Sequence, residues 1–184
     1  MRRHVLAPAL IALVALGLAG CAAADDEAGP RETPSVPQSL APSATDVAVD
    51  EQNADEICEA ESASGDADTC VLKNTEIEGS IVFDGTRVVK LINTTVTGEA
   101  KIIGAESVVV TDSDVAGDLE MLANTDAVVT TSTVGATLTV DGGKSGTVSA
   151  NEVHGDLNCS GNGAVKGEGN AVSGSAANQC AALG

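Results

Sequence analysis

Five cysteines carry most of the chemistry that the residue types of this 184-residue chain allow. A thiol can be acylated, paired in a disulfide or used as a metal ligand, and its surroundings decide between these fates. Cys21 stands at the end of an apolar N-terminal stretch, far from the others. The other four follow in the larger part of the chain: Cys58, Cys70, Cys159 and Cys180.

The N-terminus has the pattern of an export signal. A basic start at Arg2 and Arg3 precedes the apolar residues 5–18, a stretch too short for an ordinary membrane span. The following Leu18-Ala19-Gly20-Cys21 resembles the bacterial lipobox. The resemblance implies a cleaved signal helix at 1–20, fatty acylation of Cys21 such as palmitate, and anchoring at the extracytoplasmic face of the cell membrane. An ordinary secretory signal with an incidental cysteine is the alternative.

Residues 21–57 are expected to be a disordered tether. Four of the five prolines lie here among Ala, Ser, Thr, Asp and Glu, a composition that buries too little apolar surface to offset the entropy of ordering. The whole chain has a formal net charge of -18. Such an acidic chain lacks the basic surface that nucleic acids require. Its folded part should also be repelled by anionic lipid headgroups, so we expect it to reach the membrane through the lipid alone.

An internal repeat of 19 residues dominates the remainder, 58–184. Its clearest column, called column zero, comprises Ile77, Val96, Val115, Val134, Val153 and Val172. Four residues later stand Ile81, Ala100, Leu119, Leu138, Leu157 and Ala176, and six later stand Phe83, Ile102, Met121, Val140 and Cys159. Within each segment the apolar positions differ by two, which is the period of a β-strand with one face inward.

Glycines and small polar residues mark the corners of this repeat. Glycines recur two and eight residues after column zero, where the chain must turn and positive φ suits glycine. A third corner is expected near Asn74, Asn93 and Asp112. Two residues before column zero the side chains point inward yet are small hydrogen-bonders, so they should form a ladder from coil to coil: Thr75, Thr94, Ser113, Ser132, Asn151 and Asn170.

Three strands per 19 residues predict an all-β fold, a single-stranded parallel β-helix of about five to six coils. The preference of parallel crossovers favours a right-handed coil. A sandwich or prism of 19-residue units is the alternative. The domain resembles the short-repeat β-helix of exported actinobacterial proteins, in which segments like Gly155-Asp156-Leu157-Asn158-Cys159-Ser160-Gly161-Asn162 recur. The resemblance implies a fold and a cell-envelope setting. This chain departs from it at Ala136 and Gly146.

The repeat also suggests how the four later cysteines pair. One period before Ile77 is Cys58, so a first coil should start there and include Cys70. Cys159 and Cys180 lie in the last coils. Three pairings are possible, and we favour Cys58 with Cys70 and Cys159 with Cys180 because each bond would close one end. Metal ligation fits poorly, since the spacings match no zinc pattern.

No constellation of catalytic residues is evident. His154 follows column zero and should point outward beside Glu152, as a solvated histidine more than a base. Glu99, Asp118 and Asp156 share an outward column that could in principle hold Ca²⁺, but without a calcium repeat. We therefore expect no enzyme, no metal and no cofactor, and the sequence identifies no small-molecule substrate.

The sequence leaves two classes of function open. The first is a non-enzymatic envelope scaffold or binding module, displayed from the membrane. The second is a self-assembling structural protein resembling the bactofilins, which polymerise through terminal coils; a carbohydrate-active enzyme is less favoured. Val109 and Val128 are outward by parity and adjacent in one column, so they could face an envelope protein or a second copy. They could equally be tolerated surface valines.

Overall fold

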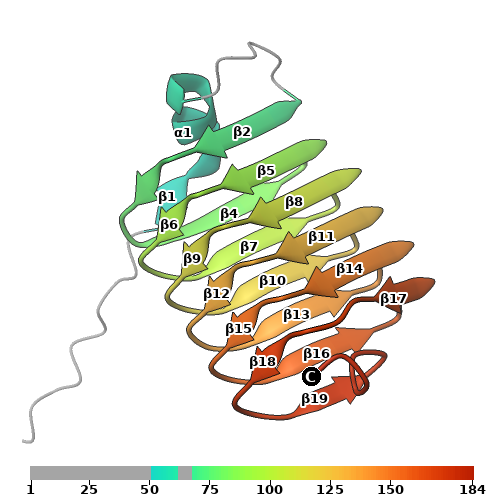
Figure 1. The fold of residues 1–184 in the computed structure, drawn as a ribbon. Coiled ribbons are helices and arrows are strands. Elements are labelled where there is room, and N and C mark those ends of the chain that lie inside the picture. The colour runs from blue at the N-terminus through green and yellow to red at the C-terminus, as the bar shows by residue number, and fades with distance from the viewer. Residues whose placement is uncertain (1–50, 62–67) are drawn as a thin grey trace, which may run out of the picture. The chain divides into compact units, whose positions relative to one another are not determined.

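The 19-residue period is present in the backbone as three parallel β-sheets. The computed structural model describes residues 51–61 and 68–184, and each coil contributes one strand to each sheet (Figure 1). Sheet A comprises β1 (Glu51–Asn53), β4 (Ser80–Asp84), β7 (Ala100–Ile103), β10 (Leu119–Leu122), β13 (Leu138–Asp141), β16 (Leu157–Ser160) and β19 (Ala176–Asn178). Sheet B comprises β2 (Thr69–Lys73), β5 (Val88–Ile92), β8 (Ser107–Thr111), β11 (Asp126–Thr130), β14 (Ser145–Ser149) and β17 (Ala164–Lys166). Sheet C comprises β3 (Glu76–Ile77), β6 (Thr95–Val96), β9 (Asp114–Val115), β12 (Thr133–Val134), β15 (Glu152–Val153) and β18 (Ala171–Val172).

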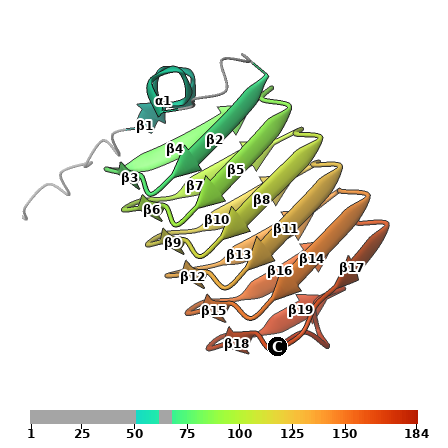
Figure 2. The same cartoon turned by 45° about the horizontal axis from the view of Figure 1, so that its top comes forward.

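This is the predicted parallel β-helix, with about six coils. Within the repeat every strand pairs with its equivalent 19 residues away, as Val96 does with Val115. The strands of sheet B lie in front in Figure 1 and run from right to left. The chain returns behind them through sheet A, and each coil lies below the one before it (Figures 1 and 2). The coil is therefore right-handed, as predicted.

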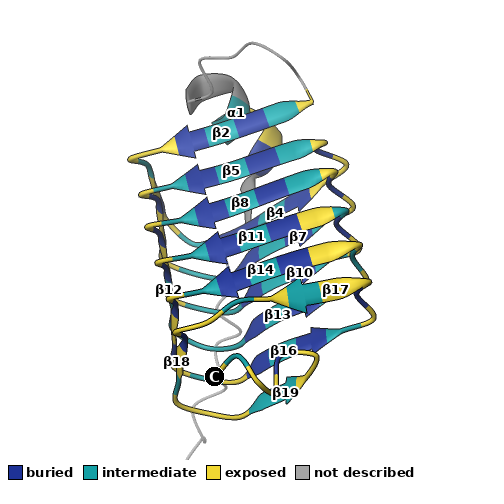
Figure 3. Cartoon of the chain, turned by 45° about the vertical axis from the view of Figure 1, so that its right-hand side comes forward, coloured by how far each residue is buried: buried dark blue, intermediate teal, exposed yellow. Residues whose placement is uncertain are grey.

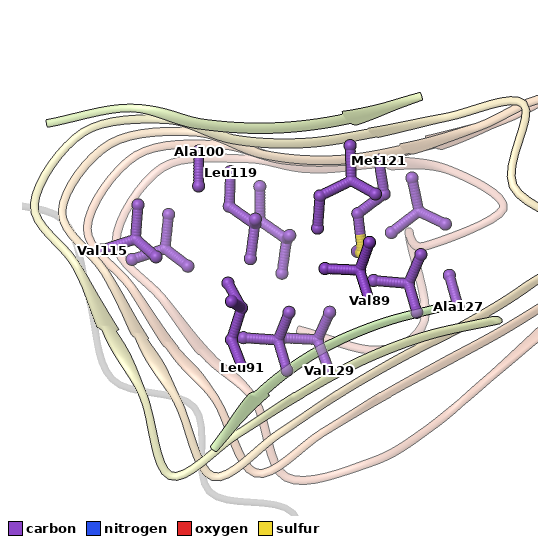
Figure 4. Close-up of a cluster of buried hydrophobic side chains, with 14 of the residues drawn as sticks. Val89, Leu91, Ala100, Val115, Leu119, Met121, Ala127 and Val129 are labelled. Carbon is purple, nitrogen blue, oxygen red and sulfur yellow. The ribbon is translucent and has the colours of Figure 1, made fainter. Parts of the chain in front are cut away.

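The inward columns form one continuous apolar core. Column zero and the positions four and six residues later are almost fully buried in the middle coils, with Val115 at 1% and Leu119 at 0% exposure. Figure 4 shows side chains of all three sheets pointing toward one another inside the stack. Because the core is one coil thick and lacks large aromatics apart from Phe83, Val, Ile and Leu fill it in regular layers.

Two of the three corners depend on positive φ. The corner predicted near Asn74 is there, with φ of 56° at Asn74 and 50° at Asn93. Asparagine and aspartate tolerate this region better than most residues, which explains their recurrence. Eight residues after column zero the φ is again positive, for example 72° at Gly104. Here glycine serves the purpose that the sequence predicted.

The glycines two residues after column zero have a different reason from the predicted one. Among them Gly79 has positive φ, but Gly117 and Gly155 do not. A Cβ at Gly155 would lie 2.7 Å from the carbonyl oxygen of Ala136 in the preceding coil. The backbones of successive coils approach too closely at this corner for a side chain, so here the glycine column follows from crowding between coils.

The N-terminal coil departs from the predicted register. Cys58 lies in a helix, α1 (Ala54–Glu61), and not in a strand at column zero. Before it, residues 51–53, expected to belong to the tether, form β1, which pairs with β4 across an offset of 29 residues, Gln52 with Ile81. The helix packs on the first strands of sheets A and B and closes the end of the stack. The signal, Cys21 and the tether up to residue 50 lie outside the described residues.

The alternation of inward and outward side chains predicts a sharp contrast between neighbouring substitutions. Val115→Asp or Leu119→Asp places an unpaired carboxylate in the apolar core, at an expected cost of about 3 kcal/mol or more in the free energy of unfolding. Thr97→Asp should cost within about 0.5 kcal/mol, because Thr97 is exposed and an aspartate oxygen can still accept the Gly79 N–H bond. Thermal or urea denaturation checks this. Equal destabilisation by all three variants would contradict the strand pattern.

Candidate functional site

The four later cysteines form the two bonds that we favoured, although Cys58 lies in a helix and not at column zero. Cys58–Cys70 joins α1 to β2 at the N-terminal end, and Cys159–Cys180 joins β16 to the C-terminal tail. Cys159 and Cys180 are completely buried. The bonds therefore fasten the two segments that cover the ends of the core, and none of the four thiols is free to act as a nucleophile or metal ligand.

The C-terminal tail takes the place of a further coil. The Gln179 side chain accepts a hydrogen bond from the Asn162 backbone N–H at 3.0 Å and donates one to the Asn162 carbonyl at 2.7 Å. The Leu183 carbonyl accepts a bond from the Asn170 side chain at 2.8 Å. Polar groups that a seventh coil would have satisfied are thus satisfied by the tail, and Leu183 packs on the core.

The predicted inward polar ladder exists, and it binds backbone as well as side chains. The Ser113 hydroxyl accepts a hydrogen bond from the Thr94 backbone N–H at 3.1 Å, and the side-chain Oδ1 of Asn151 accepts one from the Ser132 backbone N–H at 3.0 Å. The Asn151 amide group also donates to the carbonyl of Val129 at 3.0 Å. Both side chains bond to backbone groups of the preceding coil. They therefore satisfy buried N–H and carbonyl groups at the corner between the sheet B strand and the sheet C strand, where no strand pairing does so.

A second ladder, nine residues after column zero, was missed from the sequence. Asn124, 2% exposed, accepts from the Ala105 N–H at 2.7 Å and donates to the Ile102 carbonyl at 3.0 Å. Asn162 makes the same pair of bonds to Gly143 and Val140. The available signal was the spacing of 38 residues, two periods, between these two asparagines. Alanine or glycine at the intervening positions hid the column.

The candidate catalytic and calcium residues are engaged in local bonds. His154 is exposed and lies 3.1 Å from the Glu152 carboxylate. Asp118 and Asp156 each accept a backbone N–H of the following coil at 2.7 Å, from Thr137 and Ser175. Within residues 51–61 and 68–184 no three His, Cys, Asp or Glu side chains gather in a way that could hold a metal ion.

The outer face of sheet A carries an ion pair that the sequence analysis did not identify. Lys101 Nζ lies 2.6 Å from a carboxylate oxygen of Glu120 on the neighbouring strand. The hydrogen bond and the negative charge of Glu120 raise the pKa of Lys101 above its ordinary value. Both side chains are about one-third exposed, so the pair adds little stability.

The outer face of sheet B carries few charges on its strands. Val109 and Val128, predicted to adjoin, are paired residues of β8 and β11 and are half-buried. On the next strands, Lys90 of β5 pairs with Val109 and Thr147 of β14 pairs with Val128. The strands of this sheet contain one acidic residue, Asp126, and three lysines, Lys73, Lys90 and Lys166. Figure 3 shows this face with no other described element in front of it.

Comparison with models of known families, with curated proteins and with solved structures found no match. The fold itself defines the chain as a parallel β-helix. Within the described residues no helix has the length and apolar character needed to cross a membrane.

The second ladder predicts that buried and exposed asparagines respond differently to one substitution. Asn124→Ala leaves the Ala105 N–H and the Ile102 carbonyl without their partner and should lower the free energy of unfolding by about 1–3 kcal/mol. Asn158→Ala, on the outer face of sheet A, removes a partly exposed side chain of the same type and should change it by less than about 0.5 kcal/mol. Chemical denaturation measures both. Similar losses would show that the ladder contributes nothing specific.

Proposed function

We propose that this chain is a lipid-anchored, extracytoplasmic envelope protein whose β-helix acts as a non-enzymatic scaffold or binding module. The anchor is Cys21, on the strength of the lipobox-like residues 18–21. Two or three acyl chains give stable attachment where one would be marginal. The resemblance to exported actinobacterial β-helices supports the same setting. The binding surface in this proposal is the outer face of sheet B.

The observation that carries the proposal is the separation of charge between the sides of the β-helix. In a chain of net charge -18, the strands of sheet B hold three lysines and one acidic residue. The strands of sheet C and the three residues after each hold seven acidic residues and neither Lys nor Arg: Glu76, Glu78, Glu99, Asp114, Asp118, Glu152 and Asp156. Acidic macromolecules are repelled from the second side, so sheet B is where a partner can approach.

The alternative of an end-to-end polymer is disfavoured by the way both ends are covered. Unpaired strand edges invite the addition of further strands, and proteins block them with helices, loops and polar caps. Here α1 is bonded through Cys58 to β2 at one end. At the other end the tail bonded through Cys180 lies on the last coil. A second copy would have to displace both segments before its coils could stack.

An enzymatic role, including action on carbohydrates, finds little support. Three of the side chains that could serve as acid, base or metal ligand have local partners: Asp118 and Asp156 each accept a backbone N–H of the following coil, and His154 lies against Glu152, two residues before it in the chain. General acid–base catalysis needs such groups to converge on a substrate. In the described part of the chain, Glu99, Asp118 and Asp156 instead follow the repeat along one outward column, one in each of three coils.

Replacing the lipidated residue tests the anchor. Cys21→Ser should leave export intact but abolish acylation and lipoprotein-type cleavage, so the protein should move from the membrane fraction to the soluble fraction or keep its signal. Mass spectrometry of the mature N-terminus measures this. An unmodified N-terminus at a residue other than Cys21 in the unaltered protein would overturn the assignment.

The size of the detergent-solubilised full-length protein separates the module from the polymer. We expect discrete particles of one or a few chains by sedimentation and electron microscopy, unchanged over a wide range of protein concentration at which filaments would grow. Filaments of stacked β-helices formed by the oxidised protein would contradict the proposal and favour the structural polymer.

A further inference from the structure

We propose that the partner of sheet B is a second copy of this chain, bound face to face through a twofold axis that runs parallel to the strands between β8 and β11. This inference rests on the binding role proposed for this face. A twofold interface must be complementary to itself, so every residue of the face has a determined counterpart. The distribution of charge along sheet B can therefore be tested against the symmetry.

The axis places the apolar centre of the face against itself. It exchanges β8 with β11, so Val109 of each copy lies opposite Val128 of the other, and four valines meet at the axis. The same rotation sets Asp126 opposite Ser107, whose hydroxyl can donate to the carboxylate. The centre of the contact thus buries apolar surface and leaves its one acidic residue with a hydrogen-bond donor.

The rim of the contact at the carboxyl ends of the strands pairs opposite charges. The rotation exchanges β2 with the coil of β17, so Lys73 comes opposite Glu168, five periods further along the same column. Both side chains are exposed, and symmetry makes the pair twice. Lys90 comes opposite Thr147 and Lys166 opposite Val71, so no like charges face each other within the strands. At the start of the strands, Arg87 comes opposite Lys144, and this pair of exposed cations works against the contact. A twofold axis along the stack would instead set Lys90 and Lys166 each against its own copy.

The size of the face predicts a weak dimer that the membrane anchor makes effective. Six strands about 4.8 Å apart and five residues long span roughly 400 Å² per copy, about half of what a stable interface buries on each side. Anchoring both copies in one membrane raises their effective concentration, so a weak contact suffices. The side of sheet C, where seven acidic residues lie, repels a second copy and so favours contact through sheet B.

The Lys73–Glu168 pair provides a test of the dimer, because this contact can form between two chains and not within one. Within a single chain the two residues are five coils apart, about 24 Å along the stack. A water-soluble carbodiimide activates a carboxylate and lets a nearby amine form an amide, with release of a urea. Full-length acylated protein, half of it labelled with ¹⁵N, is reconstituted in phosphatidylcholine vesicles, treated with carbodiimide, digested and examined by mass spectrometry.

We expect Lys73–Glu168 peptides that join labelled with unlabelled chains. The Lys101–Glu120 pair, 2.6 Å apart within one chain, is the internal control and should give links within a single label. Lys73→Glu should reduce the intermolecular product at least tenfold. The double variant Lys73→Glu, Glu168→Lys should restore it, because the same contact then joins a lysine and a glutamate whose positions are exchanged.

Formation of the control link without the Lys73–Glu168 link would overturn the dimer, as would failure of the double variant to restore it. Both substituted residues are exposed. Thermal melts of the variants serve as the control that they fold. These outcomes are separate from those that test the proposed function. If the dimer fails, acylation of Cys21 and discrete particles would still support the anchored binding module. Filaments would contradict the binding module whatever the crosslinks show.

Discussion

The structure depends on one constraint: each coil must repeat the path of the coil before it at the spacing of a parallel strand, about 4.8 Å. Every column then becomes a row of contacting side chains, so each residue must fit against the residues 19 positions before and after it. The apolar columns give the core, the crowded corner admits glycine, and the inward polar columns must satisfy the backbone where the sheets stop pairing. Fold, stability and surface follow from this one translation.

The sequence predicted features that recur every 19 residues, such as column zero, and it missed the N-terminal helix, which does not recur. Column zero and the corner at Asn74 follow from spacing alone, because like residues recur wherever the geometry is the same. The two disulfides were predicted because each would close one end of the stack. The helix at Cys58 was mistaken for a first coil, since that cysteine happens to stand one period before Ile77. No neighbouring coil constrained the assignment there, and the 29-residue offset of β1 follows from the inserted helix.

The candidate site was less accessible from the sequence than the fold. The valine strip could be located by parity, but its meaning depended on which charges the coil brings onto the same face, and these come from four separate strands. Lys73 and Glu168 are 95 residues apart and gain significance once the coils and the symmetry of the face are known. The asparagine ladder was obscured because small residues occupy alternate rungs.

The attachment of α1 to β2 also determines how a pull on the N-terminal side of the domain would pass through the molecule. Force arriving along the chain from the N-terminus first meets β1, a strand of three residues that pairs with β4 alone. If β1 peels away, the tension passes to α1 and then through the Cys58–Cys70 bond into β2. The load reaches the edge of sheet B through a covalent link, bypassing residues 59–69 of the backbone. A domain so fastened can lose the pairing of its first strand under force and keep its stacked coils, and the face they present, intact.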